Sequence, residues 1–312
     1  MYAGYRRFVD GTPGLSQANA QLAMLNRFAG QYKALVLGSG DSPVAVFGRR
    51  VAVWDASPTH ALAIRVAASE LSVDEQHLIF SCIESYLVRR AVCGLSRKNY
   101  NKVFAQQLKK LIDGELSAAS LRTVLSSLSG DASRWPTDNE FRQQWLAGPA
   151  YPGRLDAAKL RAVFHRLETA MRTERSEERV PLDLDALDID HVMPQAWSAH
   201  WPLPDGAAVS PEETVAAAAK RFAPDSIDAR SDAILQRQDA IPRLGNLTLV
   251  HYGVNRSLQN SAFEAKRKAL FEHSNLHLNR QLMQLGSWDE AAIALRGEAL
   301  SKLALQIWPG PV

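Results

Sequence analysis

Hydrophobic positions recur at helical spacing over most of the first 175 residues. In residues 15–36, for example, Leu22, Leu25 and Phe28 share one face, as expected of an amphipathic helix. The same periodicity predicts further helices at 58–69, 73–93, 97–113, 138–146 and 156–173. We therefore expect a mainly helical N-terminal region.

Short apolar runs that are typical of β-strands interrupt this pattern. Two of them, VAVFG at 44–48 and VAVWD at 51–55, lie in the helical region. Two more, DIDHVMP at 188–194 and RLGNLTLV at 243–250, lie in the second half and precede a helical stretch at 261–273. The sequence of the second half therefore predicts two strands followed by a helix.

The second half also contains a long insertion and a different composition. Residues 198–243 separate the two strands, are rich in Pro and Ala, and predict helices at 211–222 and 227–238. In the helix at 261–273, Ser261 and Glu264 have the spacing of a capping box. A last helix is expected at 289–307. Because the acidic stretch around Pro181 ends the helical periodicity, we place a domain boundary between residues 178 and 179.

Composition narrows the class of protein. Hydrophobic residues make up 46% and charged residues 22% of the 312 positions, which is ordinary for a soluble globular protein. The two cysteines, Cys82 and Cys93, form no CxxC pair. This argues against a disulfide framework and predicts a reducing, cytoplasmic location. The net charge of +3 permits an anionic partner, and the sequence contains no apolar run of the roughly 20 residues needed to span a membrane.

The second half carries side chains that suit phosphodiester hydrolysis. Such a reaction needs a group that takes a proton from water and a cation that neutralises the leaving oxygen. His191 suits the first task, because its pKa is near neutrality. Asp190 beside it and the amide of Asn255, nine residues after Asn246, are oxygen donors of the kind that Mg²⁺ prefers.

Together, DIDHVMPQ, RLGNLTLV and GVNRSLQNSAFEAKR resemble the HNH (ββα-metal) nuclease module. More narrowly, they resemble the C-terminal domain of GmrSD-type modification-dependent (type IV) restriction endonucleases. The segments 83–104 and 135–141 resemble that family more loosely. The resemblance implies a mainly α fold with a small ββα-metal core. A helical domain at 1–178 would bind DNA or act as a scaffold, and the nuclease domain would occupy 179–312, with its helical insertion at about 198–243.

The resemblance also assigns roles to individual residues. It implies that His191 is the general base and that Asn246 supports the loop carrying it, as a second residue of the catalytic apparatus. It implies that Asp190 and Asn255 ligate Mg²⁺, with Mn²⁺ as an alternative and no zinc. Lys266, in the following helix, would contact a DNA phosphate.

The function implied is a metal-dependent DNA endonuclease that nicks or cleaves double-stranded DNA in the restriction of modified or foreign (phage) DNA. We find no Gly-rich phosphate loop in the sequence. An NTPase or sensor domain would therefore lie upstream in a longer protein or in a separate subunit. Three alternatives stay open: a DNA- or partner-binding subunit that cleaves only with such a partner, an inactive copy of the nuclease, and an RNA nuclease.

Basic residues suggest where DNA would bind. Four of them flank the candidate site: Arg256, Lys266, Arg267 and Lys268. Residues 85–112 hold seven Lys or Arg and no Asp or Glu, with interleaved aromatics, and predict a second phosphate-binding surface that includes Arg89 and Arg90. The alternatives are a solvated helical face with the aromatics in the core, or a pairing of these two arginines with acidic residues of 174–188.

Three further histidines have less distinctive settings. His251 could assist the site or lie at the surface at the end of a strand. His273 and His277 lie one helical turn apart, and because they lack a third partner we expect surface histidines there rather than a zinc site.

Overall fold

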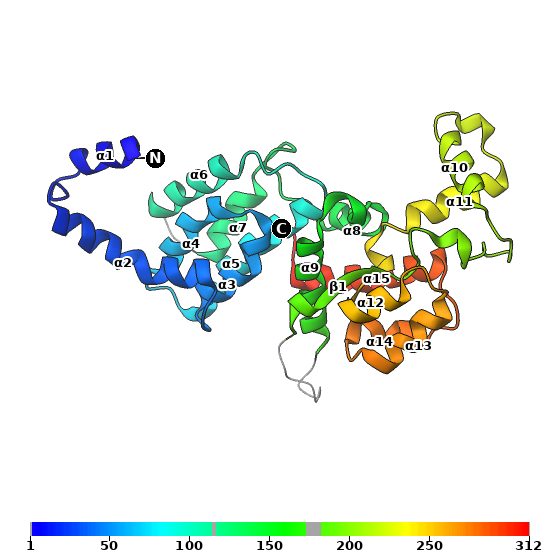
Figure 1. The fold of residues 1–312 in the computed structure, drawn as a ribbon. Coiled ribbons are helices and arrows are strands. Elements are labelled where there is room, and N and C mark those ends of the chain that lie inside the picture. The colour runs from blue at the N-terminus through cyan, green and yellow to red at the C-terminus, as the bar shows by residue number, and fades with distance from the viewer. Residues whose placement is uncertain (1, 114–116, 173–181, 312) are drawn as a thin grey trace. The chain divides into compact units, whose positions relative to one another are not determined.

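The computed structural model describes residues 2–113, 117–172 and 182–311. Within these residues the protein is mainly helical, with one two-stranded sheet (Figure 1). The chain forms two compact units, one comprising Met1–Leu87 and Ser96–Arg134 and the other Val88–Leu95 and Trp135–Pro311. The boundary predicted at 178/179 lies outside the described residues, and the helices just before it already belong to the second unit.

The first unit is helical, as its periodicity predicts. Its helices are α1 (Tyr2–Gly11), α2 (Ala18–Leu37), α3 (Pro43–Val51), α4 (His60–Ala67), α5 (Val73–Val92), α6 (Tyr100–Asp113) and α7 (Ala118–Ser126). The last residues of α5 belong to the second unit. No helix among the described residues is long and apolar enough to cross a membrane.

The strands predicted at 44–48 and 51–55 are wrong. The first run lies in α3 and the second continues into a 3-10 turn. Ser42 caps α3 by accepting a hydrogen bond from Ala45 N, and Pro43 occupies the first turn, where its missing N–H costs nothing. Val44, Phe47 and Val51 are buried on one helical face, so burial of that face outweighs the β-propensity of the valines.

Aromatic residues of α5 and α6 fill the core of the first unit. Tyr86 and Tyr100 are 6.0 Å apart between ring centroids, and Phe104 lies edge-on to both. Phe80 stacks on Phe47 of α3 at 4.7 Å. The aromatics interleaved with basic residues in this stretch are therefore core residues, as one of the two alternatives proposed.

The second unit holds the sheet and the remaining helices. They are α8 (Asp138–Ala147), α9 (Ala157–Met171), β1 (Leu187–His191), α10 (Pro211–Lys220), α11 (Ala229–Ala240), β2 (Leu247–His251), α12 (Tyr252–Leu258), α13 (Phe263–His273), α14 (His277–Gln284) and α15 (Glu290–Ile307). The strands β1 and β2 are antiparallel, with Asp190 opposite Thr248 and His191 opposite Leu247.

Helix α12 follows β2 directly and contacts both strands. This short helix, which the sequence analysis did not predict, carries Asn255. The capping box predicted at Ser261 is absent: the helix α13 begins after Ala262, which forms no side-chain cap. The carbonyl of Ser261 instead accepts a hydrogen bond from Trp201 Nε1 at 3.2 Å.

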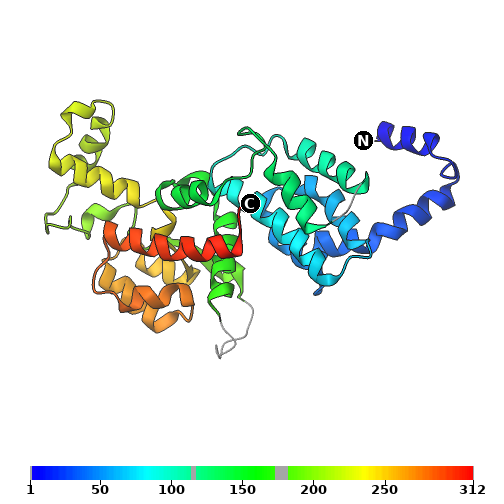
Figure 2. The same ribbon diagram turned by 180° about the vertical axis from the view of Figure 1, so that it is seen from behind.

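Helix α15, the red helix in Figure 2, packs against the 3-10 turn Leu244–Asn246 that leads into β2. The Arg296 side chain of α15 is buried and donates to the carbonyls of Gly245 and Leu247 at 2.8 and 2.7 Å. Burial lowers the pKa of Arg296 to about 10. The guanidinium supplies hydrogen bonds to two carbonyls at the start of β2, so β2 enters the sheet in a fixed position.

The insertion between the strands packs into the same core as the sheet. Ile234 and Ile241 of this segment share one hydrophobic cluster with Val192, Val250 and Trp288. The insertion therefore braces the sheet. It is also anchored by the buried Arg237, whose guanidinium donates to the carbonyls of Trp201 and Pro202 and pairs with Glu290 of α15.

Candidate functional site

The two residues that the sequence predicts to carry the chemistry lie at the end of β1. Asp190 and His191 are its last two residues, and strand geometry directs adjacent side chains to opposite faces. Both nevertheless line one pocket of about 300 Å³, together with Pro194 of the loop that follows β1. Asn255 of α12 contributes to the same pocket. Three of the four predicted site residues are thus brought together.

The imidazole of His191 has a defined tautomer. Its Nε2 lies 2.9 Å from the carbonyl oxygen of Tyr151. Because a carbonyl can only accept, Nε2 carries the hydrogen, and in the neutral ring Nδ1 holds the lone pair. The Tyr151 ring also stacks on the imidazole, with 5.7 Å between ring centroids. The ring is therefore held in position with one nitrogen able to take a proton.

The surroundings keep His191 neutral. Burial lowers the pKa of His191 below its usual value, and the positive charge of Lys266 lowers it further, while the hydrogen bond to Tyr151 acts in the opposite direction. Since the protonated form is disfavoured, the imidazole is in its basic form at neutral pH. This is the state that a general base needs before the reaction begins.

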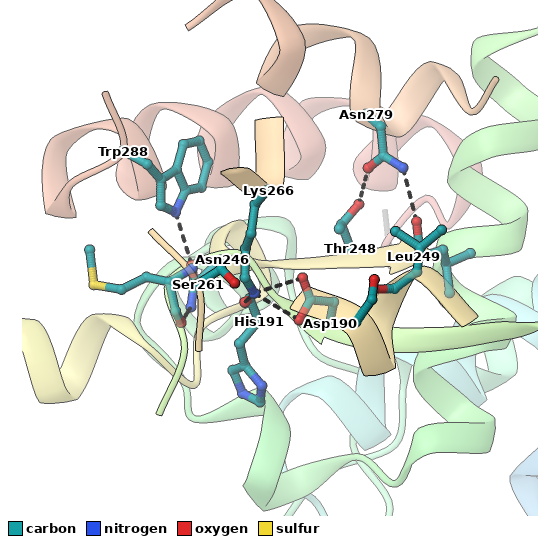
Figure 3. A network of polar contacts seen from close by, with 12 residues as sticks. Asp190, His191, Asn246, Thr248, Leu249, Ser261, Lys266, Asn279 and Trp288 are labelled. Carbon is teal, nitrogen blue, oxygen red and sulfur yellow. Dashed lines mark hydrogen bonds and ion pairs between the residues drawn. The ribbon is translucent and has the colours of Figure 1, made fainter. Parts of the chain in front are cut away.

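Lys266 occupies a position that the sequence analysis did not anticipate. Its Nζ donates to both carboxylate oxygens of Asp190 at 3.0 Å and to the carbonyl of His191 at 2.7 Å (Figure 3). The side chain of Lys266 is only 2% exposed. The predicted phosphate contact of Lys266 is therefore wrong, because its ammonium is buried and already surrounded by protein oxygens.

The carboxylate of Asp190 is subject to opposing influences. Burial raises its pKa above the usual range, whereas the charge and hydrogen bonds of Lys266 lower it. A buried carboxylate would otherwise be costly, so the ammonium supplies the compensating charge. This ion pair fixes the carboxylate at the pocket wall.

Asn246 acts away from the pocket. It is fully buried, and its Oδ1 accepts hydrogen bonds from Met193 N at 2.8 Å and Trp288 Nε1 at 3.0 Å (Figure 3). Its Nδ2 donates to the carbonyls of Met193 and Ile241, both at 2.9 Å. These four bonds hold the loop that follows His191, so the geometry suits a supporting role rather than contact with a substrate.

Three amide side chains that the sequence analysis passed over also line the pocket: Gln195, Gln259 and Asn260. Gln259 follows α12 with a φ of 34°, a conformation that is uncommon for a residue with a Cβ. The run Gln259-Asn260, within the motif GVNRSLQNSAFEAKR, was the sequence signal that could have identified two of these three residues. The role of the Tyr151 carbonyl could not be found from the sequence, because every residue has a backbone carbonyl.

The oxygen donors of the pocket suit a hard divalent cation. Asp190 offers a carboxylate and Asn255 an amide, and both face the same space, where water could complete the ligand set. Among the described residues, no group of three or more His, Cys, Asp or Glu could hold a metal ion. A site here would thus depend on the amide and on water, and the ammonium of Lys266 would weaken its attraction for a cation.

The residues predicted to bind DNA separate into two groups. Arg89 and Arg90 are fully buried, so the prediction that they bind a phosphate backbone is wrong. Arg89 instead donates to the carbonyls of Trp308 and Pro136 and pairs with Asp138. Arg256 and Lys268 are exposed and Arg267 is half-buried. Arg256 also lines the pocket, which leaves it in reach of a bound phosphate.

The remaining histidines lie outside the pocket. His251 is exposed and caps α12, with its Nδ1 accepting from Gly253 N at 3.2 Å. His277 is paired with the buried Glu168 at 3.2 Å, and Leu278 N donates to the same carboxylate. His277 is thus a structural residue rather than the surface histidine that we expected.

The second unit thus combines a small antiparallel sheet, followed directly by a helix, with a pocket lined by a histidine, a carboxylate and an amide. A family model described as GmrSD restriction endonucleases, C-terminal domain, matches residues 135–303. The chain belongs to this family, and the match begins where the main segment of the second unit begins. Membership indicates a nuclease of the restriction-endonuclease class. No curated protein and no solved structure matches the chain.

Proposed function

We propose that the protein is a metal-dependent DNA endonuclease of the HNH type that restricts modified or foreign DNA. The observation that carries the proposal is the state of His191. The ring is neutral, its Nε2 is bound to the Tyr151 carbonyl, and Nδ1 is left with its lone pair. The residue lines a pocket with oxygen donors and an exposed arginine.

In the proposed reaction, Nδ1 of His191 takes a proton from a water molecule as its oxygen attacks the phosphorus. The bond between phosphorus and the leaving 3′ oxygen breaks, and the leaving oxygen takes a proton from solvent water. The proton on the imidazole is later released to solvent. Nε2 keeps its hydrogen throughout, because the Tyr151 carbonyl holds it. Arg256 contacts a non-bridging phosphate oxygen and Asn246 keeps the loop after His191 in place.

Asp190 and Asn255 would hold a Mg²⁺ or Mn²⁺ ion. When bound, such an ion neutralises negative charge that develops on the phosphate and on the leaving oxygen. Lys266 keeps the carboxylate of Asp190 turned toward the pocket. The exposed Lys268 and the half-buried Arg267 of α13 would add sequence-independent attraction for the DNA backbone.

Removal of the metal tests the proposal. Supercoiled plasmid should be nicked by the protein in Mg²⁺, remain intact in EDTA, and be nicked again when Mg²⁺ or Mn²⁺ is added in excess. An RNA substrate of matching sequence, run in parallel, tests the preference for DNA. Cleavage that continues undiminished in EDTA would rule out the mechanism. Binding of DNA without cleavage until an NTPase partner is added would favour the role of a subunit.

A further inference from the structure

A second pocket adjoins the candidate active site. Its volume is about 460 Å³, within the range of roughly 300–1,000 Å³ that is usual for ligand sites. Gln195 lines both pockets. Pro152, which also lines the second pocket, directly follows Tyr151, whose carbonyl holds His191. The two segments that shape the surroundings of His191 therefore also form walls of the second pocket.

The lining of this pocket suits a flat, neutral group. Pro152, Trp197 and Ile241 present apolar surface, and Gln195 and Gln238 bring amides that can hydrogen-bond to an occupant. None of the described residues that line it carries a charge. A phosphate or a sugar-phosphate backbone would find no compensating cation here, whereas a nucleobase could pack its faces on the apolar walls and bond its edges to the amides.

We propose that this pocket binds a nucleobase adjoining the scissile phosphate after that base has been extruded from the duplex. The proposal rests on the proposed function, because it places a phosphodiester at His191. The base of a neighbouring nucleotide is tethered to that phosphate by a single sugar, and the adjoining pocket is where it can be accommodated. A stacked and paired base could not enter a concave site, so the base must leave the helix.

The proposal gives the insertion a function beyond bracing the sheet. Thr214 of α10 and Gln238 of α11 line this pocket together with the loop that follows His191 (Figure 1 shows both helices). Gln238 Nε2 donates to the carbonyl of Thr214 at 3.0 Å, which ties the two helices together at the pocket. The insertion would thus select the nucleotide that is presented for cleavage.

Substitution of Ala196 tests the pocket. Ala196 is exposed and lines it, so Ala196→Phe should fill the space without disturbing the core. Ala199→Phe is the matched control, because Ala199 is exposed on the adjoining 3-10 turn and lines neither pocket. Thr214→Phe fills the same pocket from α10 and serves as the second variant if Ala196→Phe does not fold.

The probe is a set of short duplexes with 2-aminopurine at successive positions, whose fluorescence rises when the base leaves the stack. With the full chain in the His191→Ala background, we expect a rise at one or more positions. Ala196→Phe should abolish the rise and Ala199→Phe should preserve it. In the His191-containing protein, Ala196→Phe should slow DNA cleavage at least tenfold. An unchanged fluorescence rise in Ala196→Phe, or DNA binding without any rise, overturns the proposal.

A second assay distinguishes a failure of the proposed function from a failure of the base-binding proposal. Hydrolysis of bis(p-nitrophenyl) phosphate, a diester without a nucleobase, reports on the hydrolytic site of the wild-type protein. If that diester and plasmid DNA are both left intact in Mg²⁺ and the duplexes do not bind, the proposed function is wrong. If the diester is hydrolysed and the 2-aminopurine signal does not depend on the pocket, only the base-binding proposal is wrong.

Discussion

At the scale of single residues, two asparagines in the same motif have different tasks. Asn246 is fully buried and uses both atoms of its amide group in four hydrogen bonds. Asn255 is half-buried and lines the candidate pocket. The sequence shows two asparagines nine positions apart but does not show which one lies inside. Burial therefore distinguishes a supporting residue from a candidate ligand.

The corresponding alanine variants should separate these tasks. Asn246→Ala leaves buried donors and acceptors of Met193, Trp288 and Ile241 unsatisfied, each at a cost of about 1–3 kcal/mol. We expect its free energy of unfolding to fall by about 3 kcal/mol or more. Asn255→Ala should change stability by less than about 1 kcal/mol and yet abolish cleavage. Urea denaturation and plasmid nicking measure both effects; equal stability losses would refute the distinction.

Lys266 shows a limit of reading charge from sequence. A lysine beside Arg267 and Lys268 in a helix predicts an exposed basic surface, whereas its ammonium is buried against Asp190 and the His191 carbonyl. The partner lies 76 positions away in the chain. Such a pairing depends on the packing of α13 against β1, which no local pattern encodes.

The ion pair predicts a coupling between two substitutions. Lys266→Met leaves a buried carboxylate without compensation and should lower the free energy of unfolding by about 3–5 kcal/mol. The double variant Asp190→Asn, Lys266→Met removes both charges and should recover part of that loss. Denaturant titration of the two single variants and the double variant gives the interaction free energy. Additive effects would show that the pair does not stabilise the site.

At the scale of elements, periodicity predicted helices better than it predicted strands. The helices α2, α4, α5 and α6 lie where apolar spacing predicts them, and β1 and β2 lie within the predicted runs that end at Pro194 and contain Gly245. The runs at 44–48 and 51–55 are helical, because Ser42 and Pro43 start a helix whose apolar face is buried. Alternation in five residues is compatible with one buried turn of helix, so only packing decides between them.

One close contact between elements has a direct consequence. A Cβ added to Gly245 would lie 2.2 Å from the carbonyl oxygen of Ile293 and 3.0 Å from Gly297 N, both in α15. We expect Gly245→Ala to push α15 away from the start of β2 and to lower stability by about 2 kcal/mol. Gly286→Ala is the control, because nothing lies within 4 Å of its added Cβ. Thermal unfolding compares the two; equal midpoints would mean that this contact does not position β2.

At the scale of the whole molecule, net charge is a poor guide to the DNA-binding surface. Four arginines of the second unit, Arg89, Arg90, Arg237 and Arg296, are buried. They count toward the net charge of +3 but cannot face a nucleic acid. Among the described residues that line the candidate pocket, Arg256 is the one exposed Arg or Lys. Selection of a substrate would then depend more on the pockets than on long-range attraction.

The division of the molecule could be predicted only in part. Family resemblance located the motifs at Asp190, His191, Asn246 and Asn255, and the family match from 135 to 303 agrees with it. The contribution of α8, α9 and the segment Val88–Leu95 to the second unit was missed. The contacts that join these segments to the second unit are distant in sequence and leave no local pattern. Arg89 donates to the Trp308 carbonyl, and the Tyr151 carbonyl is hydrogen-bonded to His191.

The central claim is that His191 is the base that activates water for phosphodiester hydrolysis. The most direct measurement is the rate of plasmid cleavage in Mg²⁺ by the wild-type protein, by His191→Ala and by His200→Ala, an exposed histidine outside both pockets. We predict that His191→Ala lowers the rate by about 10²–10⁴-fold with DNA affinity unchanged and the fold retained, while His200→Ala matches the wild type. Cleavage by His191→Ala at the wild-type rate would contradict the account.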